Sequence, residues 1–323
     1  MGPRAGPRSI PLPAVQDMEA QPLLQKRSVA AGKAPHPASQ ASAIVVVAEA
    51  VPLLLCLGVL GAVELGSSLA WQPQLGGRWP TGMVINSPLY GFPHRGSETV
   101  PYTWFLIVSA AVTAVCSASL EKLHGGPDQI RRGVIVFCGC WESWGWTALL
   151  TQLGKVYIAE PRPDFRDRCW PGQDDPSPEE CSAALSASQL ADQLKSFPSG
   201  HASTAAAIGV FLSGYALWTI YSRPPPPAAQ SLRQDSGGAP PPAPAPLLRQ
   251  IAHRFAFGPC LVPLLGAVFV AASRVHDWRH HPWDINAGFI VGSLVSVGML
   301  LRVTATLQQL QSIPAGGSEE GPE

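Results

Sequence analysis

The chain has 323 residues, of which 22 are lysine or arginine and 22 are aspartate or glutamate, so its net charge is close to zero. That balance argues against a nucleic-acid partner held by a broad positive field. Only 14% of the residues are charged, whereas soluble domains carry about 25%, and 46% are hydrophobic. The composition therefore indicates an integral membrane protein.

Residues 1–42 are rich in proline, alanine, glycine and basic residues and show no apolar periodicity. Such a segment cannot bury enough apolar surface to fold, so we predict a disordered cytoplasmic tail. The first apolar run begins too late for a signal peptide. Within the tail, Glu19 and the pair Leu23-Leu24 fit an acidic dileucine sorting pattern. That pattern predicts sorting adaptors as partners, although motifs this short often occur by chance.

Six apolar runs follow, and each is close to the length that spans about 30 Å of hydrocarbon as a helix. They cover residues 43–69, 103–120, 133–153, 202–221, 256–272 and 284–302. We therefore predict an all-α fold, a bundle of six transmembrane helices, in one membrane domain over residues 43–303. In the last run Gly288 and Gly292 form a G-x-x-x-G pair, which favours close helix packing.

Two further segments are predicted to lie on the cytoplasmic side. A low-complexity stretch rich in proline and alanine, residues 223–250, separates the fourth and fifth runs. We predict an extended linker there, and a ligand for a proline-recognition domain is the alternative. The predicted C-terminal tail, residues 304–323, is short, glycine-rich and acidic at its end.

Basic residues between the runs set the expected orientation. Placing both termini in the cytoplasm gives the cytoplasmic segments a modest excess of lysine and arginine. Several basic residues on the opposite side are candidates for a chemical role, which exempts them from the rule. We therefore predict a multi-pass protein of the plasma membrane or an endomembrane, with both termini cytoplasmic.

Three polar stretches lie at the ends of the runs: Lys155–Pro163, Pro198–His201 and Ser273–Asp284. Counting the spans places all three on one face of the membrane, whichever way the chain is oriented. Charged and titratable groups at a membrane boundary are costly to desolvate, so a cluster of them indicates a functional site. With cytoplasmic termini, that site faces the extracellular space or an organelle lumen.

These stretches carry the donors that a phosphate group needs. They combine three cations, a hydroxyl group, and a glycine that lets backbone N–H groups approach closely. The start of the fourth run adds the N-terminal end of a helix, which favours an anion. The predicted phosphate-binding residues are Lys155, Arg162, Ser199, Gly200 and Arg274.

Two histidines, His201 and His280, are left for the chemistry. An alkoxide leaves phosphorus readily only if its oxygen is protonated, so one histidine is expected to be a general acid. The other is expected to attack phosphorus and form a phospho-histidine that water then hydrolyses. Asp284 lies four residues after His280, so if a helix begins near Pro282 its carboxylate can orient the ring. The scheme requires no metal or other cofactor.

Each motif residue also has a plain structural interpretation. Lys155 and Arg162 fit the positive flank of a membrane span, and Ser199 fits a helix cap. His201 alone would more often be an interfacial histidine than an acid. The joint occurrence of these residues is what favours a site.

Other polar residues nearby are interpreted as outside the chemistry. His276 and His281 are given no role, His281 because it lacks the four-residue spacing to Asp284. Asp277 is interpreted as a solvated loop charge. A last group is left open between the rim of the site and a solvated loop: Asp164, Arg166, Asp167 and Arg168.

Five of the seven cysteines lie in apolar runs, where small buried thiols are common. Cys138 and Cys140 lack the partner ligands of a zinc site. Cys169 and Cys181 lie in a polar loop and are expected to form a disulfide if that loop faces an oxidising compartment.

At the three polar stretches the sequence resembles the type 2 phosphatidic acid phosphatase (PAP2) superfamily, and within it the lipid phosphate phosphatases. The family pattern is K-x6-R-P, then P-S-G-H, then S-R-x5-H-x3-D, and every fixed position is present in this chain. Motif order and six-span layout match too, so the resemblance covers about residues 43–303. Two features depart from many animal members: the predicted lumenal loops contain no glycosylation sequon, and the proline-rich insert is long.

The resemblance implies a PAP2 / vanadium haloperoxidase-like helical core. It implies that His280 is the nucleophile, oriented by Asp284, and that His201 is the general acid. The five phosphate-binding residues named above are implied to hold the phosphate. The resemblance also implies action on lipid phosphates without Mg²⁺.

We therefore expect an integral membrane phosphatase for phosphatidate, lysophosphatidate, sphingosine 1-phosphate or ceramide 1-phosphate. One alternative is a diphosphatase for polyprenyl or diacylglycerol pyrophosphates, or a sugar phosphatase that uses the same site. An alternative from another class is a non-catalytic membrane signalling scaffold. The expected partners are the lipid substrate and the bilayer, without nucleic acid, and formation of a homo-oligomer is left open.

Overall fold

The computed structural model describes residues 50–63, 87–126, 128–172, 181, 185–224 and 246–312. The predicted tail over residues 1–42, with its dileucine pattern, lies outside these residues. So do most of the predicted linker, from residue 225 to 245, and the end of the predicted C-terminal tail, from residue 313.

The described residues form helices and contain no strand, which confirms the all-α prediction. Helix Ala50–Val63 comes first. The later elements are η1 (Pro88–Tyr90), α2 (Tyr102–His124), α3 (Gln129–Ile158), α4 (Phe165–Cys169), α5 (Ala187–Gln193), α6 (Gly200–Leu217), η2 (Trp218–Ser222), α8 (Pro246–His276) and α9 (Pro282–Ser312).

Four of the described helices are long and apolar enough to cross a membrane: Tyr102–His124, Gly200–Ser222, Arg254–His276 and Pro282–Ser312. Large apolar side chains such as Trp104, Leu265 and Leu294 are exposed on them, as expected for surfaces that face lipid rather than water. The chain is therefore a membrane protein.

The other two predicted spans are helical over their described parts, but these parts are not both long and apolar enough to cross a membrane by the same criteria. Ala50–Val63 is apolar but short. α3 has 30 residues, yet it carries charged groups such as Glu142, which forms an ion pair with Arg302 of α9. Packing against other helices, rather than hydropathy, accounts for the place of α3 in the bundle.

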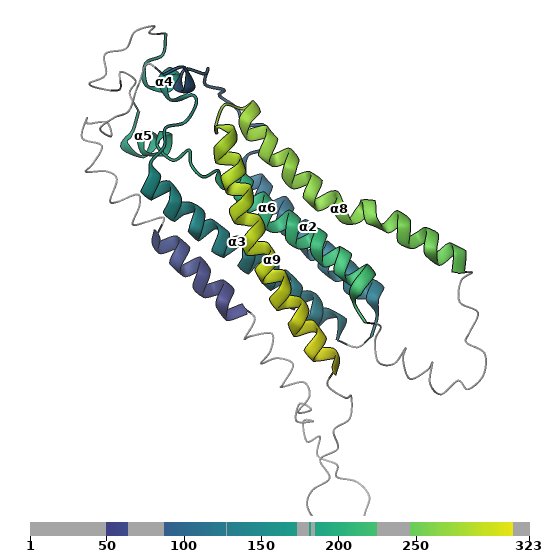
Figure 1. Ribbon diagram of the computed structural model, residues 1–323. Coiled ribbons are helices and arrows are strands. Elements are labelled where there is room, and N and C mark those ends of the chain that lie inside the picture. Colours follow the sequence, from purple (N-terminus) through teal and green to yellow (C-terminus); the bar gives the residue numbers. More distant parts are fainter. Residues whose placement is uncertain are drawn as a thin grey trace, which may run out of the picture.

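α6 is the central helix, packed against α3, α8 and α9 (Figure 1). Its alanine- and serine-rich sequence lets neighbouring helices approach closely, and most of its residues are buried. The predicted glycine pair contributes on the α9 side: a Cβ atom on Gly288 would lie 2.6 Å from the backbone oxygen of Ser199. Gly292 lies in the same way against the backbone at Ser203. Glycine at these positions therefore fixes the distance between α9 and the start of α6.

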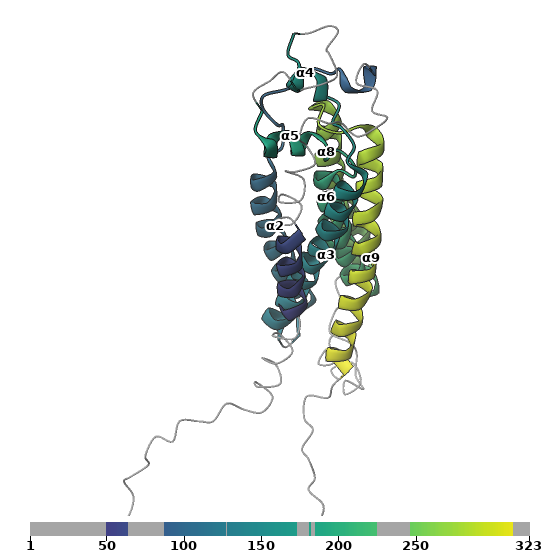
Figure 2. The same cartoon turned by 90° about the vertical axis from the view of Figure 1, so that its left-hand side faces the viewer.

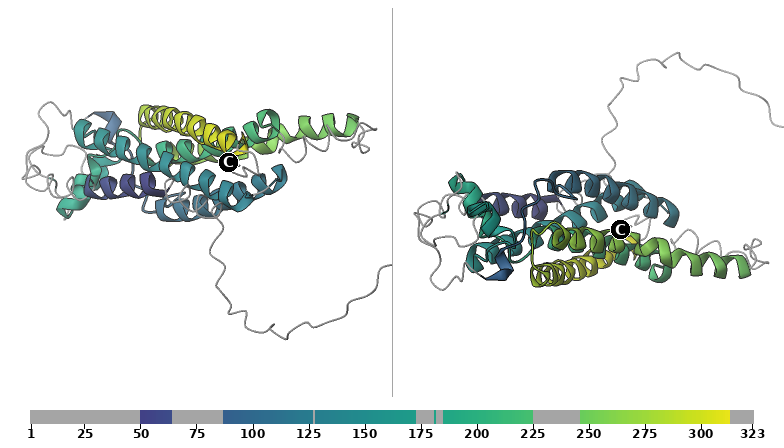
Figure 3. Two further views of the ribbon diagram at one scale, coloured as in Figure 1. Left: turned by 90° about the horizontal axis from the view of Figure 1, so that it is seen from below. Right: turned by 90° about the horizontal axis from the view of Figure 1, so that it is seen from above.

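The polar end of the bundle is formed by α4, α5 and the loops around them (Figures 1 and 2). α3 ends there, α6 begins there, and the turn between α8 and α9 lies there as well. The N-terminal part of α8 projects away from the other helices toward the opposite end (Figure 3). α9 continues to Ser312, past the predicted span end at residue 302, because hydropathy marks the lipid-facing length of a helix and not its last hydrogen-bonded turn.

A buried charge cluster lies at the end of the bundle opposite to α4 and α5. Glu121 of α2 is fully buried, and its two oxygens lie 2.6 Å from Arg132 Nε of α3 and 2.6 Å from Arg223 Nη1 after η2. The hydroxyl of Tyr215 on α6 also donates to this carboxylate. One carboxylate thus joins three helical segments.

Candidate active site

A cavity of about 360 Å³ opens at the polar end of the bundle. All three sequence motifs contribute to its wall, through Lys155, Arg162, Gly200, His201, Arg274 and His280. The remaining two predicted site residues, Ser199 and Asp284, do not line the cavity; both are fully buried behind it. The structure therefore brings the three stretches together and separates residues that face the cavity from residues that support them.

Ser199 begins α6 as its N-cap, and its hydroxyl accepts a hydrogen bond from the backbone N–H of Ala202 at 3.4 Å. The side chain of Ser199 therefore caps the helix, which is the structural role that its position in the sequence also allowed. The next residue, Gly200, faces the cavity, and a Cβ atom there would lie 3.2 Å from Lys155 Nζ. The ammonium group of Lys155 thus lies over the first turn of α6, where backbone N–H groups have no partner within the helix.

Asp284 lies in the first turn of α9, which begins at Pro282, and joins its own motif to the start of α6. Its Oδ2 atom accepts from the Ser196 hydroxyl at 2.6 Å and from the His281 backbone N–H at 2.9 Å. Its backbone oxygen accepts from the Ser199 N–H at 3.0 Å. His280 Nδ1 lies 3.6 Å from Oδ2, which is an ion-pair distance rather than a hydrogen bond.

His280 is 3% exposed. Burial lowers its pKa from 6.5 to about 3, and the positive charges of Arg162 and Lys155 add to that effect against the opposing influence of Asp284. The imidazole is therefore neutral at physiological pH. Because Nδ1 faces Asp284, Nε2 is the nitrogen that can act in the cavity, and its lone pair is available for attack on an electrophile.

The lowered pKa of His280 predicts a pH dependence of stability. The folded state disfavours the protonated ring, so between pH 6.5 and about 3 the unfolded chain binds more protons at this residue. The stability contributed by the neutral ring is complete above pH 6.5 and is lost progressively as the pH falls toward 3. Thermal unfolding of the detergent-solubilised protein should show this fall, and the fall should be shallower in His280→Asn. Parallel pH curves for the two proteins would contradict the assignment.

His201 follows Gly200 on the first turn of α6, and its ring lies at the cavity wall. Its Nε2 atom is 3.2 Å from the backbone oxygen of Val100 and 3.4 Å from Arg274 Nη1. The ring of Tyr102 packs edge-on against it, with centroids 4.9 Å apart. These contacts hold a proton-bearing nitrogen at the edge of the space that His280 also faces.

Arg162 is held in place by the segment that includes α5. Its Nε and Nη2 atoms donate to the backbone oxygen and to Oδ1 of Asp192, both at 2.9 Å, and Nη1 lies 3.4 Å from the backbone oxygen of Arg279. Burial tends to raise the pKa of the Asp192 carboxyl, but the charges of Arg162 and Lys155 lower it overall. Asp192 is thus an ionised partner of two of the predicted phosphate-binding cations.

Arg274 is completely buried on the last turn of α8, and here the structure corrects an interpretation from the sequence. Asp277 was expected to be a solvated loop charge, but it is 2% exposed, and its Oδ2 atom lies 2.9 Å from Arg274 Nη2. The two residues are three apart at the end of a helix, so their side chains meet on one face. Ser273 Oγ accepts from Arg274 Nε at 3.1 Å.

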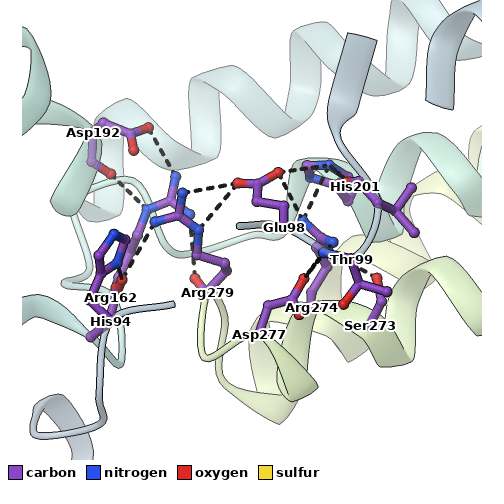
Figure 4. A network of polar contacts seen from close by, with 12 residues as sticks. His94, Glu98, Thr99, Arg162, Asp192, His201, Ser273, Arg274, Asp277 and Arg279 are labelled. Atoms are coloured by element: carbon purple, nitrogen blue, oxygen red, sulfur yellow. Dashed lines mark hydrogen bonds and ion pairs between the residues drawn. The ribbon is translucent and has the colours of Figure 1, made fainter. Parts of the chain in front are cut away.

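Two further charged residues, Glu98 and Arg279, line the cavity although neither was predicted as a site residue (Figure 4). Arg279 directly precedes His280, which was the available signal for it. Glu98 lies before α2, far in sequence from every motif, and no pattern pointed to it. Asp192 was missed for the same reason. The cavity therefore holds four cations and two carboxylates: Lys155, Arg162, Arg274, Arg279, Glu98 and Asp192.

His281 also differs from expectation, because it contacts the carboxylate that serves His280. Its Nδ1 atom lies 3.4 Å from Asp284 Oδ2 and 3.7 Å from Glu160 Oε1. Burial tends to lower the pKa of His281, but the hydrogen bond and charge of Asp284 raise it overall. A spacing of four residues was expected for a histidine that contacts Asp284. His281 is three residues away, and it reaches the carboxylate because the chain turns between α8 and α9 and places the ring over the start of α9.

Glu160, His281 and Asp284 are also the one group among the described residues whose ligand atoms lie close enough to hold a metal ion, within 4.8 Å of one another. Protein donors already serve the carboxylates, since Trp283 Nε1 donates to Glu160 at 2.8 Å and Ser196 donates to Asp284 at 2.6 Å. His281 Nδ1 lies within 3.7 Å of an oxygen of each carboxylate, and Asp284 raises the pKa of this ring. The group fits an ion cluster that supports Asp284 better than it fits a metal centre.

A disulfide joins Cys169 and Cys181, and Cys169 packs with Phe165, Trp170 and Leu194 in a small buried cluster. Asp164 is one of the charged residues that the sequence left open between the rim of the site and a solvated loop. It is fully buried and lies 2.6 Å from His94 Nδ1. It belongs to the inner structure of the rim rather than to a solvated loop.

Comparison with known proteins agrees with this geometry. The sequence profile described as PAP2 superfamily matches residues 140–307, which include all three motifs. The chain is 27% identical over 223 residues to diacylglycerol pyrophosphate phosphatase 1 of Saccharomyces cerevisiae, covering 66% of this chain and 67% of the relative. It is 29% identical over 213 residues to probable diacylglycerol pyrophosphate phosphatase 1 of Schizosaccharomyces pombe, covering 63% and 65%.

A plant protein is similar over a shorter region. The chain is 31% identical over 157 residues to lipid phosphate phosphatase 1 of Arabidopsis thaliana, covering 46% of this chain and 39% of the relative. The matched region thus spans about two thirds of each yeast relative and well under half of the plant one. No solved structure gives a significant match.

Proposed function

The chain belongs to the PAP2 superfamily, and on that premise we propose that it is a membrane-bound lipid phosphate phosphatase that hydrolyses phosphate monoesters without Mg²⁺. The observation that carries the proposal is the single cavity in which His280, His201 and the predicted phosphate-binding cations converge. The substrates proposed are phosphatidate, lysophosphatidate, sphingosine 1-phosphate and ceramide 1-phosphate.

The cavity wall carries apolar side chains as well as charged ones, which favours a lipid substrate. Leu60 of the first helix and Trp144 and Ala148 of α3 line the same space as the cations. A lipid phosphate has this division within one molecule, with a dianionic headgroup attached to apolar chains. The headgroup would lie among the arginines and lysine while the chain follows α3 toward the bilayer. A sugar phosphate would leave the apolar wall without a partner.

In the proposed first step, His280 Nε2 attacks phosphorus and forms the N–P bond while the bond to the lipid oxygen breaks. His201 gives its proton to that oxygen, which leaves as the lipid alcohol. Lys155, Arg162 and Arg274 stabilise negative charge on the three remaining phosphoryl oxygens. In the second step His201 accepts a proton from water, whose oxygen attacks phosphorus and releases phosphate from His280.

Asp284 acts through His280 and does not touch the substrate. Its carboxylate lies 3.6 Å from Nδ1 of the ring, and two protein donors fix its orientation. As the ring becomes positively charged in the phospho-histidine, the nearby carboxylate stabilises it. Asp284 is thus a positioning residue of the proposed mechanism.

Phosphate release by the purified full-length chain in detergent, with EDTA present, tests this function. Short-chain phosphatidate should be hydrolysed, whereas a sugar phosphate at the same concentration should be hydrolysed poorly because it cannot use the apolar wall. Equal rates on both substrates would contradict the lipid assignment. A complete loss of activity in EDTA that Mg²⁺ restores would contradict metal independence. No release from any lipid phosphate would favour the signalling scaffold.

A second candidate is hydrolysis of lipid diphosphates. It is supported by the fourth cation, Arg279, and by the names of the two yeast relatives, which are diacylglycerol pyrophosphate phosphatases. A diphosphate carries more negative charge than a monoester and has more use for an additional guanidinium. Adding diacylglycerol pyrophosphate to the same assay separates the two candidates by their relative kcat/KM.

A further inference from the structure

Glu98 lies between two arginines at the centre of the polar network (Figure 4). Its Oε2 atom is 3.2 Å from Arg274 Nη1, and its Oε1 atom is 3.0 Å from Arg279 Nη2 and 3.2 Å from Arg279 Nε. His201 Nε2 is 3.9 Å from Oε2. The carboxylate therefore occupies the position where two guanidinium groups and the proposed general acid meet.

The backbone around Glu98 is anchored, so only its side chain reaches into the cavity. The N–H and hydroxyl of Thr99 donate to the two oxygens of Asp277 at 2.8 and 2.6 Å. Earlier in the same segment, Phe92 stacks on Trp278 with ring centroids 4.2 Å apart. The Glu98 side chain itself is 28% exposed, which gives the carboxylate a path to solvent without movement of the backbone.

Arg274 offers only one edge to a ligand. Its Nη2 atom is paired with Asp277 and its Nε atom with Ser273, so Nη1 is the nitrogen that points into the cavity. Glu98 accepts from that nitrogen. It also accepts from the Nε and Nη2 edge of Arg279, which is the fork that binds carboxylates and phosphates equally well. The contacts that hold Glu98 are therefore the contacts that a phosphoryl oxygen would use.

We propose that Arg274 and Arg279 form a phosphoryl-binding subsite whose resident anion, when no phosphate is bound, is the carboxylate of Glu98. The ligand class is a dianionic phosphoryl group, carried either by a lipid or as free phosphate. Glu98 moves toward solvent when that group enters and returns when it leaves. This inference rests on the proposed phosphatase function and names the residue that competes with its substrate and its product.

The electrostatics support an internal competitor. Cations in a partly buried cavity are costly unless anions neutralise them. Asp277 pairs with Arg274 and Asp164 lies 3.5 Å from Arg279 Nη1, and Glu98 adds a carboxylate that contacts both arginines from the cavity side. An entering dianion supplies two negative charges where one was present, so it can replace the carboxylate. After hydrolysis the same carboxylate competes with free phosphate, which limits retention of the product.

Equilibrium binding to the purified full-length protein in detergent tests the proposal without relying on turnover. The probes are radiolabelled inorganic phosphate in equilibrium dialysis and a non-hydrolysable short-chain lipid phosphonate in calorimetry. Glu98→Gln should bind both ligands about tenfold more tightly, because the competing negative charge is removed. A tenfold change corresponds to only a small part of the Coulomb energy between two unit charges about 4 Å apart. Glu98→Asp, whose shorter side chain reaches the arginines poorly, should shift both affinities in the same direction by less.

Asp167→Asn is the matched control, because it also removes one carboxylate on the same side of the protein. Asp167 does not line the cavity, and an asparagine oxygen can still accept the hydrogen bond that Asp167 receives from the His94 backbone at 2.7 Å. Both affinities should stay within twofold of wild type in this variant. A tenfold gain here would show a general charge effect and overturn the subsite.

The remaining outcomes separate the subsite, its ligand and the proposed phosphatase function from one another. Weaker binding of both ligands to Glu98→Gln would mean that Glu98 positions the arginines, and unchanged binding would mean that it does not compete. A gain for free phosphate alone would exclude the lipid headgroup as an occupant, and a wild-type protein that binds neither probe would exclude the subsite. Tighter binding by Glu98→Gln in a protein that hydrolyses no lipid phosphate would retain the subsite and refute the phosphatase function.

Discussion

Replacing His280 by asparagine is expected to reduce phosphate release from lipid phosphates by a factor on the order of 10⁴ or more, as removal of a catalytic nucleophile generally does. His280 is neutral because burial lowers its pKa to about 3, so its lone pair is available at every pH at which the protein would be assayed. The ring lines the cavity and has the carboxylate of Asp284 behind its other nitrogen, at 3.6 Å. Asparagine cannot form the N–P bond.

The measurement is single-turnover hydrolysis of radiolabelled phosphatidate, with the acid-labile phospho-protein trapped by rapid denaturation in base. Wild type should carry label on histidine and the variant should carry none. His276→Asn is the matched control, because His276 is an exposed histidine four residues earlier that contacts Arg95 outside the cavity. It should retain the wild-type rate. Trapped label in His280→Asn, or equal losses in both variants, would contradict the assignment of the nucleophile.

The placement of His280 shows what could be predicted from the sequence. A helix that starts at Pro282 puts Asp284 in its first turn, and proline at that position is a local signal. Counting of membrane spans then brings separate helix ends to one face without any knowledge of how the helices pack. The predicted phosphate-binding residues could be proposed together because they lie in short segments at the ends of these spans.

Contacts made by the loops could not be predicted in this way. Glu98 reaches the cavity because Thr99 binds Asp277 across a separation of 178 residues, and no local pattern encodes that contact. Asp277 and His281 were judged by exposure and spacing, and both were misjudged because the chain reverses between α8 and α9 and buries them. The hydropathy pattern likewise says little about α3, whose polar groups find partners on neighbouring helices.

The largest expected loss of stability arises at the opposite end of the bundle, in Glu121→Gln. This substitution keeps the shape of the side chain but removes the negative charge that Arg132 and Arg223 share at 2.6 Å each. Both arginine side chains are almost completely buried, so neither can recover hydration without opening the junction of α2, α3 and η2. Breaking a buried ion pair from one side costs about 3–5 kcal/mol, because it leaves uncompensated charge behind.

Thermal unfolding of the detergent-solubilised proteins should therefore show a midpoint lowered by about 10 °C in Glu121→Gln. This value follows from a loss of about 3 kcal/mol in unfolding free energy, since each kcal/mol lowers the midpoint by a few degrees. Asp128→Asn is the matched control, since it makes the same chemical change at an exposed residue on the same end of the bundle. Asparagine tolerates the left-handed backbone of Asp128, where φ is 57°, so its midpoint should be within about 2 °C of wild type. Equal midpoints for the two variants would mean that Arg132 and Arg223 are satisfied without Glu121. The cluster would then be a consequence of helix packing and not one of its causes.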